Sequence, residues 1–344
     1  MNENRKHILD FIKGLCIIFV IITHFSWSDK ERLYPVFPYL IDMAVPIFMV
    51  ISGYLWASSL MLKTTTFTDA YKMDYIMPRL RRYLFPFTVA FIVEIVPYYI
   101  FVNKGGGVIA FVQGGYGPGS YYVPILIQLI FIFPVIFWMI RKHDLLGLVI
   151  CILINLFYEA IKDLYGVTEE CYRLLVFRYI TELSFGCYFA IGKRKIKKIW
   201  KYAIGIVGGL FIFITTYTEY ETVIFKYWTG TSMISCLYII PVMKFLINCK
   251  SLRCKFMEYI GRYSYEIYLV QMVYYFALSG FVKSNFDNRF IQLLVGLIIC
   301  IAGGVIFGII VGAILGHLPK RDVNYYQRIE RKVEFWINKV FERI

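Results

Sequence analysis

Two ionisable residues, Lys13 and His24, lie in a stretch of sequence that is otherwise almost entirely apolar. The stretch runs from Ile12 to Trp27. An ionisable side chain in the middle of a bilayer costs roughly 2.5 kcal/mol or more, so we expect both residues to have a function. Imidazole titrates near neutral pH and is suited to take a proton from a substrate hydroxyl. His24 is therefore the candidate general base.

A carboxylate follows in the next apolar run, at Asp42. If the first two runs are neighbouring membrane helices, Asp42 and His24 lie at similar depths near the same surface. A carboxylate beside an imidazole orients the ring and supports its action as a base. We therefore expect Asp42 to assist His24, a pairing that rests on topology alone.

A basic cluster stands where the third apolar run begins, in "MPRLRRYLFP". Such a cluster is the usual anchor of a membrane span. Its arginines, Arg79 and Arg82 among them, also present planar guanidinium groups that bind phosphates through paired contacts. Together with Lys13 they would form a phosphate-binding mouth at the opposite end of the membrane from His24.

The elements that position these residues are membrane helices. The chain has 344 residues, of which 59% are hydrophobic and 19% aromatic, and its mean hydropathy is +0.62. Each span needs about 20 residues, and the sequence predicts an all-α, polytopic transmembrane helix bundle of about ten spans. The predicted spans are 8–27, 36–60, 83–102, 120–140, 145–161, 173–191, 201–217, 228–247, 264–282 and 290–316.

Charge distribution orients this bundle. Loops on the same side as the N-terminus hold about three times as many Lys and Arg residues as the loops opposite, which predicts a multi-pass protein of the plasma (inner) membrane with both termini in the cytoplasm. The net charge of +14 is then explained by these loops, so we expect no nucleic-acid partner. Residues 1–322 form one transmembrane domain, and residues 323–344 are expected to form an amphipathic helix on the membrane surface.

Eight cysteines are scattered without CxxC or His-rich spacing. We read them as small buried side chains and expect neither a disulfide framework nor a metal site.

Four short motifs resemble those of the acyltransferase type 3 family, polytopic enzymes that modify sugars and other cell-surface molecules. They are a basic residue and a histidine separated by ten residues (Lys13, His24), "FMVISGYL" from Phe48, the pair Arg79 and Arg82 followed by Pro86, and "SYEIYL" from Ser264. The motifs occur in the family's order along nearly the whole chain.

The resemblance implies a membrane O-acyltransferase. The donor would be cytoplasmic acyl-CoA, most simply acetyl-CoA, used as a co-substrate without a tightly bound cofactor. Lys13, Arg79 and Arg82 would bind its phosphates, and His24, with Asp42, would deprotonate an acceptor hydroxyl. The acceptor would be a cell-surface glycan or its lipid-linked precursor.

Candidate substrate-binding residues lie in several segments. Ser52 precedes a glycine in the second span, where the two small residues would break the helix or let neighbours approach closely. Tyr121 and Tyr122 end a loop rich in glycine and aromatic residues that would stack on a sugar. Gln128 would bond either a substrate or another helix. Gln271 stands where many members of the family have histidine, and this departure bears on the identity of the acceptor.

Two alternatives from other functional classes stay open. In a transporter or flippase, Lys13, His24, Asp42 and Glu182 would form a path for protons or substrate. In a membrane sensor without catalysis, the same residues would serve binding alone.

Overall fold

The computed structural model describes residues 3–64, 66–101, 107–192, 198–218, 233–248 and 254–317, and every regular element in these ranges is helical. The first half contains α1 (Glu3–Thr23), α2 (Asp29–Arg32), the π-helix η1 (Phe37–Ile41), α3 (Ala44–Lys63), the 3-10 helix η2 (Thr68–Tyr71), α4 (Met73–Phe101), α5 (Gly107–Val112), α6 (Tyr122–His143) and α7 (Leu145–Leu164). The second half contains α8 (Glu169–Arg173), the 3-10 helix η3 (Val176–Tyr179), α9 (Ile180–Ile191), α10 (Lys198–Tyr217), α11 (Met233–Asn248), α12 (Lys255–Arg262), α13 (Ser264–Val273), the π-helix η4 (Tyr274–Leu278), α14 (Ser279–Asn285) and α15 (Arg289–His317).

The protein is a membrane protein, but the expected number of about ten spans is not confirmed. Within the described ranges, four helical segments are long and apolar enough to cross a membrane: Phe37–Leu62, Tyr122–His143, Leu145–Lys162 and Arg289–Gly316. The other predicted spans also contain helices. However, α1 and α4 begin with charged turns, and α9 and α13 are only 12 and 10 residues long. The amphipathic helix predicted for residues 323–344 lies outside the described residues.

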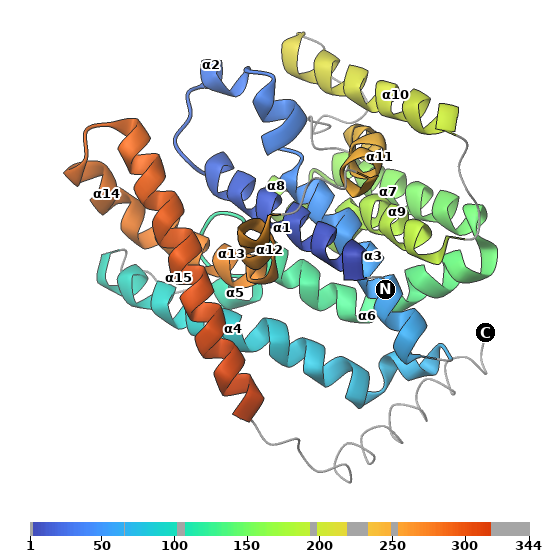
Figure 1. Cartoon of the computed structure of the whole chain (residues 1–344), viewed down its shortest axis with the longest axis horizontal. Coiled ribbons are helices and arrows are strands. Elements are labelled where there is room, and N and C mark those ends of the chain that lie inside the picture. Colours follow the sequence, from blue (N-terminus) through green and yellow to red (C-terminus); the bar gives the residue numbers. More distant parts are fainter. Residues whose placement is uncertain are drawn as a thin grey trace.

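The helix that carries Lys13 is surrounded by other helices. α1 packs against α3, α12, α13 and α15, and Figure 1 shows α1 in the interior of the arrangement, with α15 crossing one side next to α13. At the contact with α12, a Cβ on Gly14 would collide with the backbone of Met257, and a Cβ on Gly261 would collide with the backbone of Asp10. Two glycines thus let the backbones of α1 and α12 touch.

The predicted break at Ser52 and Gly53 does not occur, because α3 continues as a helix from Ala44 to Lys63. Gly53 serves helix packing instead: a Cβ there would collide with the carbonyl of Leu183 on α9, and a Cβ on Gly186 of α9 would collide with the carbonyl of Val50. The irregular backbone lies earlier, where η1 ends at Ile41, Asp42 caps it, and α3 begins at Ala44. π-Helical turns of this kind are frequent at functional sites.

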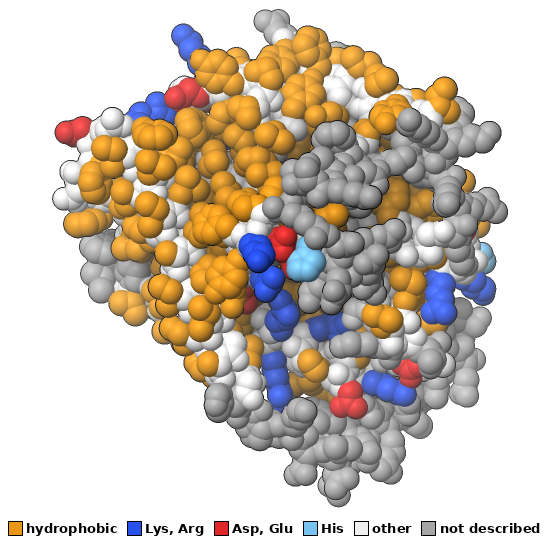
Figure 2. All heavy atoms as spheres, viewed as in Figure 1, with side chains coloured by type: hydrophobic (Ala, Val, Ile, Leu, Met, Phe, Trp, Pro, Cys, Tyr) orange, Lys and Arg blue, Asp and Glu red, His pale blue; other side chains and the backbone are white. Residues whose placement is uncertain are grey.

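Apolar side chains cover much of the outer surface. On α15, Phe290, Ile298 and Ile306 are each more than half exposed. Figure 2 shows hydrophobic side chains over most of the viewed face, with a small group of charged side chains near its centre and further Lys and Arg side chains below. An apolar surface of this extent fits contact with lipid.

Candidate functional site

The two ionisable residues of the first apolar run lie on one side of α1. His24 directly follows the last residue of the helix, and Lys13 lies in its middle. The step of eleven positions from Lys13 to His24 corresponds to about 16 Å of helix. Both side chains line a cavity of about 510 Å³, called here the cationic cavity.

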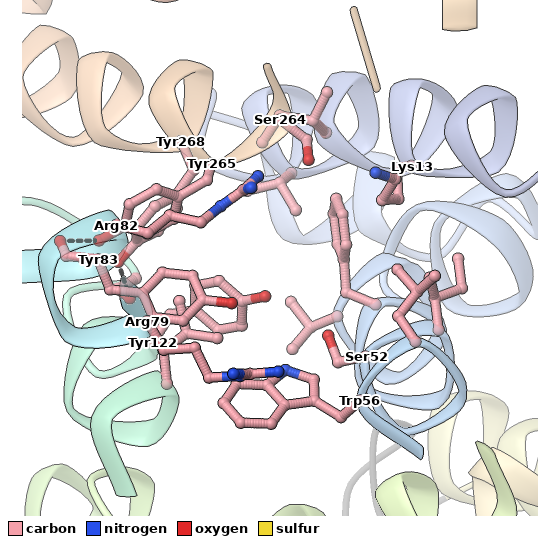
Figure 3. Close-up of a pocket in the computed structure, with 18 of the residues that line it drawn as sticks. Lys13, Ser52, Trp56, Arg79, Arg82, Tyr83, Tyr122, Ser264, Tyr265 and Tyr268 are labelled. Carbon is pink, nitrogen blue, oxygen red and sulfur yellow. Dashed lines mark hydrogen bonds between the residues drawn. The ribbon is translucent and has the colours of Figure 1, made fainter. Parts of the chain in front are cut away.

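The cationic cavity is enclosed by α1, α3, α4, α6 and α13. It is lined by the predicted phosphate ligands Lys13, Arg79 and Arg82, by the predicted substrate-binding residues Ser52, Tyr121 and Tyr122, and by Trp56, Tyr83, Ser264 and Tyr268. Figure 3 shows the nitrogen atoms of Arg79 and Arg82 reaching into this space from α4, with Lys13 and Ser52 across from them. The structure therefore brings together three cations from two distant segments of sequence.

Arg79 is held in a fixed orientation by neighbouring side chains. Its guanidinium carbon lies 3.4 Å from the centroid of the Tyr75 ring and 5.2 Å from that of Trp56. Nη1 donates to the Tyr75 carbonyl at 2.8 Å, and Nη2 donates to Ser59 Oγ at 2.8 Å. The guanidinium is thus held by two aromatic rings and two hydrogen bonds, which orient its remaining N–H groups.

The other two cations differ in how they are paired. Lys13 Nζ lies 2.8 Å from Asp10 Oδ1, so part of its charge is neutralised within α1. Arg82 is exposed and makes no ion pair or hydrogen bond with any residue in the described part of the chain. The arginine cluster also lies inside α4, which begins at Met73, and not at the start of a span near residue 83 as predicted. The first turns of α4 therefore carry the cluster.

His24 has both ring nitrogens available. Its ring packs at 62° to Tyr275, with centroids 6.0 Å apart. A Cβ built on Gly119 would lie 3.6 Å from His24 Nε2, so this nitrogen faces the loop before α6. Among the described residues, no hydrogen bond to either ring nitrogen occurs. An imidazole in this state can accept a proton from a bound hydroxyl.

The loop after α1 is clamped to the far end of the chain. Lys283 Nζ donates to Ser26 Oγ at 2.7 Å, and Arg289 Nη2 donates to the Ser26 carbonyl at 2.6 Å. Because Ser26 is two residues beyond His24, these contacts restrict the position of the imidazole.

A second cavity, of about 660 Å³, adjoins the first. We call it the loop cavity because the segment from Gln113 to Tyr121 forms one wall; His24, Asp42, Glu170, Arg173 and Arg178 also line it. The two cavities share five lining residues: Val20, His24, Val45, Gly119 and Tyr121. His24 is the titratable imidazole at this junction.

Asp42 and His24 line the same cavity, but the described structure contains no hydrogen bond between them. The charge of Arg32 acts on both residues. Asp42 and His24 therefore line the same cavity, but Asp42 does not make the hydrogen bond that would orient the imidazole.

Two predicted substrate-binding residues lie outside both cavities. Gln128 Nε2 donates to the Leu174 carbonyl at 2.6 Å, and its Oε1 accepts from the Val176 N–H at 3.0 Å. This side chain ties α6 to the segment before α9, which is the second of its two predicted roles. Gln271 is fully buried on α13, and neither side-chain polar atom has a hydrogen-bond partner.

Several lining residues were not anticipated from the sequence. Trp56 and Ser59 follow Ser52 at helical spacing and line the cationic cavity with it, so the spacing i, i+4, i+7 was a signal that could have found them. Tyr268 lies in the fourth motif, and its hydroxyl donates to the Gly119 carbonyl at 2.8 Å. No sequence pattern pointed to Gly119, whose φ is +86°.

Comparison with known proteins gives one match. Residues 6–312 match the model of a protein family described as an acyltransferase domain, the type 3 family whose motifs the sequence resembles. Searches of curated proteins and of solved structures find no significant match. The matched range contains every residue that lines the two cavities.

Proposed function

The chain belongs to the acyltransferase type 3 family, and from this premise we propose that it transfers an acyl group from acyl-CoA to a hydroxyl of a cell-surface glycan or its lipid-linked precursor. Acetyl is the simplest acyl group to expect. The observation that carries the proposal is the place of His24, which lines both the cationic cavity and the loop cavity.

The cationic cavity suits the donor. CoA carries several phosphates on one end of a long, thin arm. Arg79 and Arg82 offer guanidinium groups for these phosphates, with Lys13 at the same end of the cavity. The arm would then extend along α1 toward His24, over the helical rise of about 16 Å. In the predicted topology the phosphate end faces the cytoplasm, where acyl-CoA is made.

The loop cavity suits the acceptor. Tyr121 lies at the junction with its ring stacked on Tyr179, with 6.4 Å between centroids and 12° between planes. Such an aromatic surface can contact the apolar face of a sugar ring. Ser52 and Tyr122, on the cationic side, would contact the thioester end of the donor or the acceptor hydroxyl.

The proposed reaction is direct transfer. His24 takes the proton from the acceptor hydroxyl as its oxygen attacks the thioester carbonyl. The carbon–sulfur bond then breaks, the new ester bond remains on the acceptor, and the imidazolium returns the proton to the CoA thiolate. Asp42 would orient the imidazole once the acceptor is bound, because catalytic hydrogen bonds are often longer before substrate arrives.

A transfer assay with purified protein tests the proposal. The protein, reconstituted in nanodiscs, is given acetyl-CoA labelled in the acetyl group and a panel of glycans and lipid-linked sugars. We expect release of CoA and labelling of one acceptor class, and loss of both in His24→Ala with binding of CoA retained. Full turnover by His24→Ala would show that the proposed base is wrong.

Two adjoining cavities that share a histidine would also suit a transporter or flippase. Transport predicts movement of a labelled sugar across a liposome membrane without consumption of acyl-CoA. Acyl transfer predicts that no product forms unless acyl-CoA is cleaved. Measuring both in the same liposomes separates the two functions.

A further inference from the structure

Arg178 lies in the wall of the loop cavity, close to two aromatic rings. Its guanidinium carbon is 4.9 Å from the centroid of Tyr172 and 5.2 Å from that of Tyr179. The side chain is partly buried. Contact with these rings limits the movement of the guanidinium without using its N–H groups.

Within the described part of the chain, Arg178 has no ion pair and no side-chain hydrogen bond, unlike the cations around it. Arg173, which lines the same cavity, pairs with Glu169. Lys162 lies 3.4 Å from Glu159 Oε2, and the Tyr172 hydroxyl donates to the other oxygen of Glu159. The oxygens of Glu159 are therefore occupied.

Glu182 lies one helical turn beyond Arg178. The charge of Arg178 acts on the Glu182 carboxyl group, but the two side chains do not come within ion-pair distance of each other. Glu182 is buried, and its Oε2 has no hydrogen-bond partner. Of the two remaining carboxylates at the loop cavity, Asp42 and Glu170, neither forms an ion pair with Arg178. A guanidinium removed from bulk water without a hydrogen-bonded partner is costly.

A guanidinium has five N–H donors in a planar fork that matches a carboxylate or a phosphate. We propose that Arg178 binds an anionic group, a carboxylate or a phosphate, on the acceptor that occupies the loop cavity. This inference rests on the proposed function, because it takes the loop cavity as the acceptor site. The adjacent ring pair of Tyr121 and Tyr179 would hold the sugar while Arg178 holds its charge.

Binding of three glycosides with the same octyl chain tests this directly. Octyl β-glucoside is neutral, octyl β-glucuronide has a carboxylate at C6, and octyl β-glucoside 6-phosphate has a phosphate there. Dissociation constants are measured by titration with the protein in nanodiscs. We expect at least one anionic glycoside to bind ten or more times more tightly than the neutral one, and we expect Arg178→Gln to remove this preference without changing affinity for the neutral glycoside.

Arg173→Gln is the matched control, because Arg173 lines the same cavity but is paired with Glu169. It should reduce the preference much less. Equal loss in both variants would mean that only the overall potential of the cavity attracts anions, which overturns the specific role of Arg178. Equal affinity of the wild type for all three glycosides also overturns it.

Two further measurements distinguish acceptor binding by Arg178 from a role toward the donor and from a role in stability. If Arg178 instead recognises a charged acyl group, Arg178→Gln will weaken binding of succinyl-CoA and not of acetyl-CoA, and the acceptor assignment is wrong. If it serves only to balance Glu182, Arg178→Gln will lower the unfolding temperature without ligand and a second change, Glu182→Gln, will restore it, which also overturns the proposal. The glycoside titrations require no turnover. If the protein fails to transfer acyl groups, the effect of Arg178→Gln on binding of the anionic glycosides can still be interpreted.

Discussion

The guanidinium carbon of Arg79 lies over the ring of Tyr75, 3.4 Å from its centroid, and Nη1 donates to the carbonyl oxygen of the same residue at 2.8 Å. Arg82, three residues later, lines the same cavity without a protein partner in the described ranges. One arginine is thus built into the structure, while the other is available to a ligand. Mutating each arginine in turn should therefore separate the effect on ligand binding from the effect on stability.

Arg82→Ala should weaken binding of CoA about tenfold, since a hydrogen bond to a charged group contributes about 1.5 kcal/mol or more. The unfolding temperature should not change. Arg79→Ala should weaken binding and also lower the unfolding temperature, because its contacts with Tyr75 and Ser59 are lost. Both losses of affinity should shrink at high salt, where screening already weakens the wild-type contacts. Titration with CoA at two salt concentrations checks this, and unchanged affinity in both variants would contradict the donor site.

His24→Ala should lower kcat by about 10² to 10⁴, the usual contribution of a general base. The KM for acetyl-CoA should stay close to the wild-type value, because Lys13, at the phosphate end of the cavity, lies about 16 Å from His24 along α1. Steady-state kinetics separates the two constants. His24→Gln provides a control of similar size that keeps hydrogen bonding but cannot act as a base, and it should be as slow as His24→Ala.

Asp42→Asn should lower kcat more than it weakens donor binding if the carboxylate orients the imidazole after the acceptor binds. The pH dependence of kcat should shift as well, because removing a neighbouring negative charge makes a protonated imidazole less favourable. The profile of kcat against pH, compared with the wild type, provides the measurement. A profile identical to that of the wild type would assign Asp42 to the support of the turn between η1 and α3.

The sequence predicted the helical class of the fold, and eight of its ten candidate site residues line the two cavities. Long apolar runs indicated helices where the structure has them, because a backbone that crosses lipid must satisfy its hydrogen bonds within helices. Lys13 was recognisable because a charge in an apolar run is costly, and Arg79 and Arg82 were recognisable because clustered guanidinium groups suit phosphates. The number of spans is not confirmed, because several of the predicted runs form helices that are short or begin with charged turns.

Other parts of the site depend on contacts between distant segments. The loop cavity forms where the segment from Gln113 to Tyr121 meets the residues around Arg178, and no local pattern brings these together. The amide of Gln128 has the same hydrogen-bonding groups whether it binds a substrate or a backbone, so the sequence could not decide between them. Only the positions of Leu174 and Val176 show its use in this structure.

Gly119→Ala should reduce both stability and turnover. Its φ of +86° lies in the left-handed region, and a Cβ would lie 3.4 Å from the Tyr268 ring and 3.6 Å from His24 Nε2. Gly192→Ala is the matched control, because φ there is +65° and nothing lies within 4 Å of its Cβ position. We expect each change to cost about 1 kcal/mol through backbone strain, but only Gly119→Ala to slow catalysis. Equal turnover in the two variants would show that the contact with His24 does not matter.

The clamp on the loop after His24 should be sensitive to acid. Arg289 contacts Glu31 at 3.1 Å and also holds Ser26. Hydrogen bonds from Ser28, followed by a hydrogen bond from Arg289 and then its charge, lower the pKa of Glu31 to about 2.

Because the ordinary pKa of Glu31 is 4.5, its contribution to stability is fully present above that pH and is lost as the pH falls toward 2. Glu31→Gln should therefore remove a part of the decline in unfolding temperature between pH 5 and pH 3 (an interval chosen around these pKa values). Arg289→Ala should in addition lower kcat several-fold at neutral pH, because it also releases Ser26, two residues beyond His24. Thermal unfolding across this pH range, together with kinetics at neutral pH, tests both effects. If Arg289→Ala has wild-type kcat, the clamp does not position the imidazole.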